Sequence, residues 1–387
     1  MPFIHRAIEG QILKATKHFA ALILTGPRRS GKTTLLRKLF PHAAYYLLED
    51  PDLVGRVRSD PRAFMDEVRL PAIFDEVQNA PEILNYIRTR IDRSGQKKGQ
   101  WLLTGSQEAP LMRGVTESMA GRAALFQLFP MSQEESSKVS VLRGGYPEVL
   151  AGPSSSALWF RSYIQTYLER DVRAITAIRD LSTFRRFLSV LASRCGQMLN
   201  KTDLAAPLGV SVPTISEWLN VLEMTCQIIL VPPFYENFGK RLVKSPKIYF
   251  TDSGLVSYLL GIGSAGTLRA SPFFGSLFEG FVASEIVKHQ VNSGGRKEVY
   301  YFRDQQGLEV DFIIPGKGNR LLFVEAKASR TVTPGMAGST EALARKGFRQ
   351  KIERYVVYDA FKTGEPGLSV LKPGVKAISI LGLSKIL

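Results

Sequence analysis

An eight-residue stretch near the start of the chain has residue types and spacing suited to holding phosphate. Residues 26–33 read Gly-Pro-Arg-Arg-Ser-Gly-Lys-Thr and fit the pattern G-x-x-x-x-G-K-[ST] at every fixed position. The glycines let backbone N–H groups close around phosphate oxygens, the lysine can reach the β- and γ-phosphates, and the threonine hydroxyl can bind Mg²⁺. The spacing predicts a site for ATP and Mg²⁺. The residues expected to bind the nucleotide are Gly26, Pro27, Arg28, Arg29, Ser30, Gly31, Lys32, Thr33 and Thr34.

A pair of acids follows the apolar segment 72–74 and could turn binding into hydrolysis. Asp75, at the end of this expected strand, can hold Mg²⁺ through water. Glu76 can point toward the γ-phosphate and accept the proton of an attacking water. We therefore predict an ATPase in which Glu76 and Lys32 are catalytic. The alternative is two solvated acids that happen to follow a strand.

Three further residues could assist the same reaction. The apolar segment 101–103 ends in Thr104, with Ser106 two residues later, and these hydroxyls could sense the γ-phosphate. A plain Gly-Ser turn after a core strand explains the same residues. Arg122 could supply charge to the transition state in a neighbouring subunit, an effect worth ~10³-fold or more in such enzymes. It is the third predicted catalytic residue.

The C-terminal part carries a second set of acids. Asp311 lies in one apolar segment, and after a glycine-rich turn Glu325 and Lys327 lie in the next. Residues two apart in a strand share a face, and a hairpin can bring Asp311 beside them. Two carboxylates with a nearby ammonium suit Mg²⁺-dependent cleavage of a phosphodiester, with Asp311 and Glu325 as metal ligands. The alternative is a solvated hairpin that cuts nothing.

The middle of the chain shows a helix-turn-helix pattern. Residues 202–210 and 211–220 read as two helices separated by a glycine-containing turn. Residues 228–231 and 247–250 would form the strands of a wing. DNA contact is predicted for Thr214 and Ser216 on the second helix and for Lys240, Arg241 and Lys244 in the wing loop. Such units also serve as lids or protein contacts, and Glu217 on the second helix would repel phosphate.

The elements that must position these residues follow from the apolar pattern. Continuous rather than alternating apolar runs predict strands covered on both faces, as in a parallel sheet flanked by helices. Each run but the last is followed by a helical pattern, which is a βαβ rhythm. The expected strands are 20–24, 44–48, 72–74, 101–103 and 123–128.

Two breaks in periodicity, at 151–156 and 261–266, divide the chain. They predict a phosphate-binding domain at 1–152, a mainly helical winged-helix domain at 157–262 and a mixed helix and strand domain at 270–387.

Length and composition exclude several classes of protein. The 387 residues are 44% hydrophobic and 22% charged, which is globular rather than disordered, collagen-like or coiled-coil. No segment suits a spanning helix or a signal peptide, so we expect a cytoplasmic protein. The two cysteines fit no metal or disulfide pattern.

The net charge is +16, and most of it lies in the downstream part of the chain. Residues 1–150 carry 21 basic and 16 acidic side chains, whereas residues 151–387 carry 30 and 19. An excess of this size favours a polyanionic partner such as DNA, although many basic proteins never bind nucleic acid.

Together these features resemble one prokaryotic family, the AAA+-type P-loop ATPases with a C-terminal domain of unknown function 4143. The resemblance spans nearly the whole chain. It rests on the phosphate loop, the acids at 75–76, the hydroxyl-bearing fourth strand, the Ala-Gly-Arg of 120–122, the Gly-Gly-Tyr-Pro-Glu-Val of 144–149 and the Tyr-Leu-Glu-Arg-Asp-Val of 167–172.

The resemblance implies an α/β fold in three parts. These are an N-terminal ASCE/AAA+-like parallel sheet with flanking helices, a central winged helix-turn-helix and a C-terminal α/β domain like restriction endonucleases. The acid pattern also resembles the PD-(D/E)xK nuclease core, in which Glu279 matches an additional acid. Val310 stands where that motif has proline.

Three functions remain open from these residues. The leading one is an ATP-hydrolysing machine, assembled as a homo-oligomeric ring such as a hexamer, that moves or remodels DNA in the manner of a helicase or translocase. The second is an ATP-gated, Mg²⁺-dependent nuclease. The third is a nucleotide switch that regulates a protein partner.

Overall fold

The structure of the chain, a computed structural model, consists of two compact units. The first comprises Met1–Met131, Met224–Cys226 and Val291–Gly295, and the second holds the remaining residues. The domain boundaries expected at 152, 262 and 270 stay predictions. The residues described are 3–95, 97–106, 119–152, 156–168, 180–234, 245–360 and 367–387.

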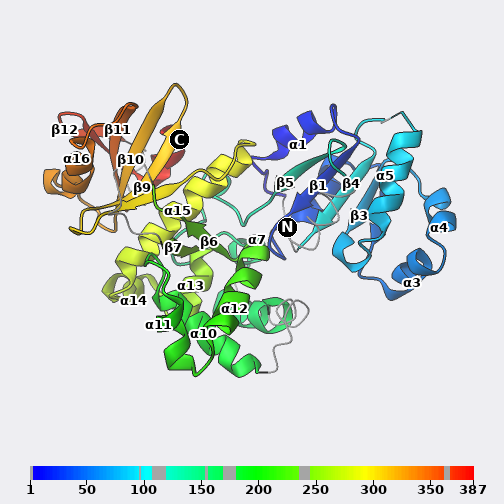
Figure 1. Cartoon of the computed structure of the whole chain (residues 1–387), viewed down its shortest axis with the longest axis horizontal. Helices are drawn as coiled ribbons and strands as arrows, with labels where there is room; N and C mark the ends of the chain where they lie inside the picture. The colour runs from blue at the N-terminus through cyan, green and yellow to red at the C-terminus, as the bar shows by residue number, and fades with distance from the viewer. Residues whose placement is uncertain are drawn as a thin grey trace. The chain divides into compact units, whose positions relative to one another are not determined.

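The first unit is built on a five-stranded parallel sheet, as the continuous apolar runs predict (Figure 1). Its strands run in the order β2-β3-β4-β1-β5. Every residue of β1, β3 and β4 is buried. The strands are β1 (Ala21–Thr25), β2 (Ala44–Leu47), β3 (Ala72–Asp75), β4 (Trp101–Gly105) and β5 (Ala123–Gln127).

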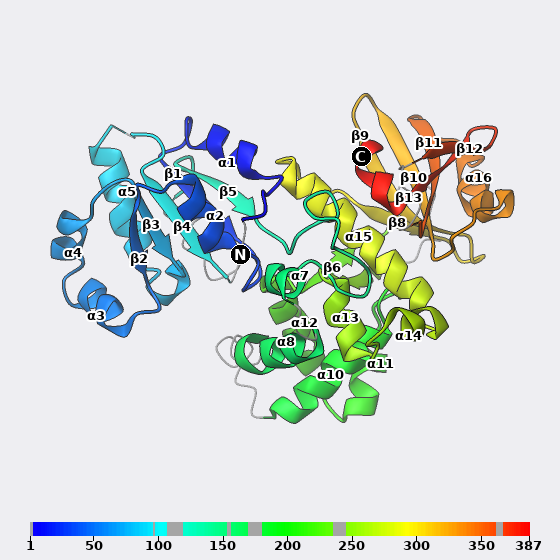
Figure 2. The same ribbon diagram turned by 180° about the vertical axis from the view of Figure 1, so that it is seen from behind.

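Helices cover both faces of this sheet because successive strand residues point to opposite sides. Ala21 and Ile23 of β1 pack in one apolar cluster with residues of α3, α4 and α5. Leu22 and Leu24 pack in another with residues of α1 and α2, the face seen in Figure 2. The helices of this unit are α1 (Glu9–Ala15), α2 (Lys32–Leu39), α3 (Pro51–Ser59), α4 (Pro61–Glu67) and α5 (Ile83–Arg93), with the 3₁₀ turn η1 (Val77–Asn79).

The strand order decides which side chains meet. Because all five strands are parallel, their carboxyl ends lie along one edge of the sheet, where ligands bind in open α/β sheets. β4 lies between β1, which leads into the phosphate loop, and β3, which ends in Asp75. Thr104 at the end of β4 is thereby placed between the two motifs.

The second unit begins with helices and a small hairpin. The two wing strands lie at the residues that the pattern predicts, whereas the first helix ends at Ala205 and continues as a 3₁₀ turn and the second helix extends to Met224. The elements are α7 (Pro147–Ala151), α8 (Ser156–Tyr163), the π-helical turn η2 (Ile164–Leu168), α10 (Leu181–Ser193), α11 (Lys201–Ala205), η3 (Ala206–Leu208), α12 (Val212–Met224), β6 (Ile228–Val231), β7 (Lys247–Phe250), α13 (Ser253–Leu259) and α14 (Ala265–Ala270).

The helix-turn-helix is held together by aromatic packing. Gly209, with φ 66°, ends η3 in the left-handed conformation that glycine tolerates best. Trp218 of α12 is 3% exposed, and its ring centroid lies 5.4 Å from that of Phe184 and 5.0 Å from that of Phe187 in α10. The apolar face of α12 is therefore buried against α10.

The Gly-Gly-Tyr-Pro-Glu-Val motif docks on the start of α13. Gly145 donates its backbone N–H to Asp252 Oδ2 at 2.6 Å, while Asp252 Oδ1 accepts from the Leu255 N–H at 3.0 Å and so caps the helix. Gly144 has φ 67°, and a Cβ added to it would lie 2.1 Å from Asp252 Oδ1. The glycine at position 144 therefore has a structural role, because the backbone there passes so close to Asp252 that a side chain would not fit.

Replacing Gly144 with alanine is expected to lower the free energy of unfolding by about 2–4 kcal/mol, because left-handed strain and overpacking add. Urea denaturation of the variant would measure the loss. Gly209→Ala is the matched control, since Gly209 has a similar φ and no atom within 4 Å of an added Cβ. Equal losses in the two variants would contradict the role given to Asp252.

The C-terminal part is a six-stranded mixed sheet in the order β12-β13-β11-β10-β9-β8. β10 pairs antiparallel with β9 and parallel with β11, so the predicted hairpin forms. The elements are α15 (Phe274–Asn292), β8 (Tyr300–Arg303), β9 (Glu309–Gly316), β10 (Arg320–Lys327), η4 (Pro334–Ala337), α16 (Gly338–Ala344), β11 (Lys351–Tyr358), β12 (Leu368–Lys372), β13 (Val375–Ser379) and η5 (Ile380–Lys385).

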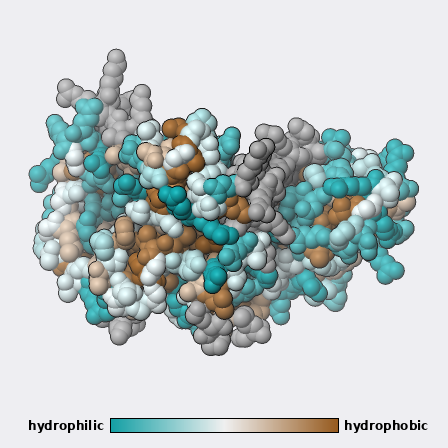
Figure 3. Space-filling model, turned by 90° about the horizontal axis from the view of Figure 1, so that it is seen from below, coloured by the Kyte–Doolittle hydropathy of each residue, from teal (hydrophilic) through white to brown (hydrophobic). Residues whose placement is uncertain are grey.

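Hydrophilic and hydrophobic residues are mixed on the face drawn in Figure 3. Among the residues described, no helix combines the length and the apolar character needed to cross a membrane.

Candidate nucleotide site and acid cluster

The phosphate loop joins β1 to α2 and depends on its glycines. Gly26 has φ 139°, and a Cβ there would lie 2.2 Å from the Leu128 carbonyl oxygen. Gly31 has φ 98° and is the N-cap of α2. The start of α2 therefore meets the loop, and this places backbone N–H groups and the positive end of the helix at the expected phosphate position.

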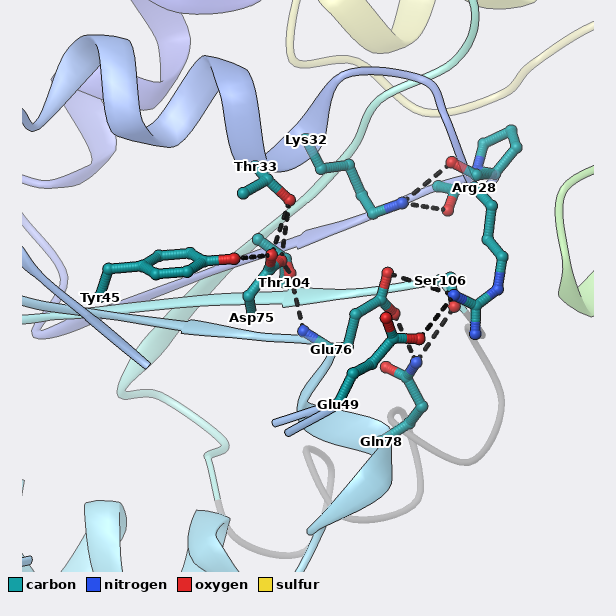
Figure 4. Close-up of polar contacts among 12 residues, drawn as sticks. Arg28, Lys32, Thr33, Tyr45, Glu49, Asp75, Glu76, Gln78, Thr104 and Ser106 are labelled. Atoms are coloured by element: carbon teal, nitrogen blue, oxygen red, sulfur yellow. Dashed lines mark hydrogen bonds and ion pairs between the residues drawn. The ribbon is translucent and has the colours of Figure 1, made fainter. Parts of the chain in front are cut away.

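Lys32 lies inside the phosphate loop (Figure 4). Its side chain is 5% exposed, and Nζ donates to the Gly26 and Pro27 carbonyl oxygens at 2.9 Å each. Burial lowers the pKa of Lys32, as does the neighbouring charge of Arg28, against the opposing effect of Glu76 and Asp75. Phosphate oxygens could replace these two carbonyls as acceptors.

Thr33 and Asp75 meet as the motifs predict. Thr33 Oγ1 donates to Asp75 at 2.9 and 2.8 Å from the two carboxylate oxygens. Thr104 donates to Oδ1 of the same carboxylate, and Tyr45 donates to Oδ2 at 2.6 Å. A hydroxyl beside a carboxylate is a hard-oxygen donor set, which fits Mg²⁺. Sequence reasoning missed Tyr45, a residue of β2 that no motif marks.

Glu76 is turned toward the loop by an unusual backbone conformation, with φ 56° and ψ 51°. Its carboxylate accepts from Gln78 Nε2 at 2.5 Å and lies 3.7 Å from Arg28 Nη1. Burial would raise the pKa of Glu76, but the charges of Lys32 and Arg28 and hydrogen bonds from Gln78 and Ser106 outweigh it and hold the pKa below its usual value. The group is therefore ionised and able to accept a proton.

Arg28 connects two carboxylates at the loop. It is 8% exposed, and the same Nη1 lies 3.0 Å from Glu49 Oε1 as well as near Glu76. Sequence reasoning placed Arg28 at the nucleotide but missed Glu49, which follows β2. No residue pattern marks Glu49, because it reaches Arg28 only through the strand order, in which β2 is next to β3.

The two hydroxyls predicted as sensors lie beside the acids. Thr104 Oγ1 accepts from the Glu76 backbone N–H at 3.1 Å, and Ser106 Oγ accepts from Gln78 Nε2 at 3.1 Å. Both are buried. Their sensing role stays a prediction, but both are connected to Glu76.

The other loop residues differ in exposure. The Ser30 side chain is buried, and its Oγ has no hydrogen-bond partner among the described residues. Arg29, with φ 62°, and Thr34 are exposed. Their contacts with a nucleotide stay predictions.

Arg122 is not brought to the nucleotide site of its own chain. Arg122 precedes β5, whereas the phosphate loop follows β1. Because β1 and β5 are parallel, the two lie at opposite ends of the strands. Its guanidinium pairs with Asp92 at 2.7 and 3.0 Å. Its contribution to a neighbouring subunit stays a prediction.

The structure describes only part of the predicted DNA surface. Thr214 and Ser216 lie on α12, half-buried, and bond locally: Thr214 Oγ1 lies 2.8 Å from Ser211 Oγ, and Ser216 Oγ donates to the Val212 carbonyl at 3.1 Å. Lys240, Arg241 and Lys244 lie outside the described residues, as do residues 169–172 of the Tyr-Leu-Glu-Arg-Asp-Val motif.

The predicted C-terminal acids converge on one face of the hairpin. Asp311 of β9 accepts from the Ala326 backbone N–H at 2.9 Å, and Lys327 donates to Glu325 at 2.8 Å, both in β10. Glu279 reaches the same cluster from α15, and the charge of Asp311 acts on both Glu279 and Glu325.

The pKa values show how crowded this acid cluster is. Burial, and then the nearby charge of Asp311, raises the pKa of Glu325 to about 8 and that of Glu279 to about 7. Glu325 is 2% exposed, and its Oε1 has no hydrogen-bond partner among the described residues. Both carboxyl groups therefore release their protons less readily, because little water can screen a second negative charge beside Asp311.

Lys247 of β7 also belongs to this cluster, although sequence reasoning missed it. Its Nζ lies 2.8 Å from Glu279 Oε1, 2.5 Å from Glu309 Oε1 and 3.9 Å from Asp311 Oδ1. Within the described part of the chain, no three His, Cys, Asp or Glu side chains are placed to share a metal ion. As they lie, the acids do not fit the Mg²⁺ that the nuclease motif implies.

Three family models match successive parts of the chain. An AAA domain matches residues 18–137, a domain of unknown function (DUF8612) matches residues 134–266, and a domain of unknown function (DUF4143) matches residues 274–367. The Walker-type ATPase paby2304 of Pyrococcus abyssi is similar with 15% identity and a TM-score of 0.44, over 65% of this chain and 94% of that one.

Two curated mycobacterial proteins are similar over most of their length. They are uncharacterized protein Rv2008c of Mycobacterium tuberculosis and uncharacterized protein Mb2031c of Mycobacterium bovis. Each is 30% identical over 341 residues, which is 86% of this chain and 76% of the relative. With them, the chain belongs to the AAA-type P-loop ATPases that carry a C-terminal domain of unknown function 4143.

Proposed function

We propose that this ATPase binds DNA and that ATP turnover moves or remodels the bound DNA. The observation that carries the proposal is the ionised Glu76 held beside a complete phosphate loop, because it equips the chain to break the β–γ bond rather than only to bind nucleotide. The energy released by this turnover would drive movement or remodelling of the bound DNA.

In the proposed reaction, Lys32 leaves the Gly26 and Pro27 carbonyls and contacts the β- and γ-phosphates. Thr33 and Asp75 would hold Mg²⁺, which would neutralise charge on the phosphate oxygens. Glu76 orients a water in line with the γ-phosphate and accepts its proton. Thr104 and Ser106 keep the two acids in place through the hydrogen bonds described above.

DNA is proposed as the partner because of the helix-turn-helix and the charge. The α11–α12 unit has the architecture that places a second helix in a DNA groove. Residues 151–387, which contain it, carry 30 basic and 19 acidic side chains, and such an excess supplies contacts to phosphate.

Adding DNA is expected to raise the ATPase rate about tenfold or more at low salt. The rate would be measured with single-stranded, duplex and junction DNA, together with the molecular mass with and without ATP. Binding should weaken steeply as salt rises, because phosphate contacts release counterions. A slow rate unaffected by every DNA, beside a stable protein partner, would instead support the nucleotide switch.

A ring of identical subunits would give Arg122 a role. Its distance from the nucleotide site of its own chain fits a charge supplied across a subunit interface. If the protein stays monomeric with ATP and Arg122→Ala leaves turnover unchanged, the ring and this role both fail.

An ATP-gated nuclease is the second candidate, favoured by the convergence of Asp311, Glu325, Lys327 and Glu279, and it requires these acids to rearrange around Lys247 before they can bind Mg²⁺. It predicts Mg²⁺-dependent cutting of DNA that Asp311→Ala abolishes while ATP hydrolysis persists. Intact single-stranded, duplex and branched DNA after incubation with Mg²⁺ or Mn²⁺ would exclude it for the wild-type protein.

A further inference from the structure

The acid cluster already contains a cation supplied by another element of the fold. Lys247 comes from the β6–β7 hairpin, more than thirty residues before Glu279 in the sequence. Its side chain is 3% exposed, and Nζ reaches Glu279 at 2.8 Å and Glu309 at 2.5 Å. A lysine is rarely buried to this extent unless carboxylates surround it.

Several contacts hold Lys247 in this place. β7 pairs antiparallel with β6, where Lys247 lies opposite Val231, and the backbone also bridges to Met198. The ammonium lies 5.6 Å from the centroid of the Tyr301 ring, a cation–π distance. Tyr249, two residues further along β7, donates to Glu279 at 2.6 Å. The strand therefore brings both a charge and a hydrogen bond to the same carboxylate.

Charge balance shows what Lys247 does for the cluster. Glu325 has Lys327 at 2.8 Å, and Glu309 also has Arg303 at 2.8 Å. Glu279 and Asp311 have no other cationic side chain within ion-pair distance among the described contacts. Without Lys247, these two partly buried carboxylates would lose their ion-pair partner, and the charge of Lys327 would still act on both.

The position of the ammonium conflicts with a divalent ion. Mg²⁺ needs oxygen ligands at about 2.0–2.1 Å in near-octahedral geometry. A metal shared by Glu279 and Asp311 would have to enter the region that Nζ occupies, and the two positive charges would repel each other at low local dielectric. Burial alone would lower the pKa of Lys247, but the charges of Glu279, Asp311 and Glu309 raise it, so the ammonium stays charged.

We propose that Lys247 is the resident cation of this cluster and that it excludes a divalent metal ion from Glu279, Asp311 and Glu325. The inference rests on the second candidate function in one respect only, that the acids can bind metal once the lysine is removed. The wing hairpin, formed by β6 and β7, would then determine whether a divalent metal ion can bind at the nuclease-like acid cluster.

The test measures Mn²⁺ binding to the full chain without nucleotide. Electron paramagnetic resonance and the rise in Tm on adding Mn²⁺ are the two readouts. Lys247→Met is expected to bind Mn²⁺ at least tenfold more tightly than the wild type. Adding Asp311→Asn to this variant should remove the gain, which locates the metal in the cluster. The matched control is Lys288→Met, because Lys288 is equally buried and pairs with Glu285 at 3.2 Å; it should bind as the wild type does.

A charge-neutral variant covers the case in which Lys247→Met does not fold. Lys247→Met with Glu309→Gln removes both members of the 2.5 Å pair and keeps all three expected metal ligands, so it leaves no extra buried charge. It should also gain Mn²⁺ binding. If both variants bind no more tightly than the wild type, or if Asp311→Asn does not remove the gain, the inference is wrong.

The outcomes separate this inference from the functions proposed above. Gained Mn²⁺ binding without DNA cutting would support the role of Lys247 and count against the nuclease. Unchanged Mn²⁺ binding would overturn the role of Lys247 and leave DNA-stimulated ATP hydrolysis to be judged by its own experiment.

Discussion

Replacing Glu76 with glutamine is expected to lower kcat for ATP hydrolysis by about 10²- to 10⁴-fold, the usual contribution of a positioned general base. Glutamine keeps the shape of the side chain but cannot accept the proton of the attacking water. The neighbouring Lys32 and Arg28 remain, so ATP should bind at least as tightly as in the wild type. Steady-state turnover and titration with a fluorescent ATP analogue would measure the two effects separately.

Glu49→Gln is the matched control for Glu76. It makes the same isosteric change on the other carboxylate that contacts Arg28 Nη1, but on a residue with no expected contact to the reacting atoms. Its kcat should stay within a few fold of the wild type. Equal losses in the two variants would mean that the position of Arg28, and not proton transfer to Glu76, limits the reaction.

Replacing Lys32 with alanine should abolish measurable turnover and weaken ATP binding, with an expected loss of about 10²–10³-fold or more in kcat/KM, as for other removed charge-stabilising donors. Among the described residues, Nζ donates its hydrogen bonds to carbonyls of the same loop, so the fold should persist. Circular dichroism would show that the variant is folded, and the ATPase rate would show that it is inactive.

Lys38→Ala serves as the control for Lys32. Lys38 lies on the same helix, α2, in its last turn and with an exposed side chain. Its replacement therefore removes a positive charge without changing the phosphate loop. Turnover in Lys32→Ala within tenfold of this control would contradict the assignment of the phosphate loop.

Local motifs predicted where the phosphate loop and the acids after β3 lie, because each is a short segment; that they bind ATP and Mg²⁺ stays a prediction. The loop at 26–33 needs glycine at two fixed positions, and the structure confirms why: Gly26 and Gly31 have positive φ, and Gly26 packs against a carbonyl. The acids at 75 and 76 directly follow a buried strand, so the edge of the sheet where they emerge could be predicted from the parallel βαβ pattern.

Partners from other strands could not be predicted in the same way. Tyr45 and Glu49 come from the edge strand β2 and the residues after it, and they meet Asp75 and Arg28 only because β2 pairs with β3. No residue pattern marks either side chain. The strand order of a sheet depends on how helices pack across both faces, which is a property of the whole unit.

The amino-acid sequence by itself determined the phosphate loop, the acids that follow β3, the helix-turn-helix and the paired strands that carry Asp311 and Glu325, because each depends on residues close together in the chain. Only the tertiary structure decided that Lys247 enters the acid cluster and that Arg122 lies at the far edge of its own sheet. Both results depend on contacts between segments distant in sequence, where burial and charge balance, and not local spacing, select the partners.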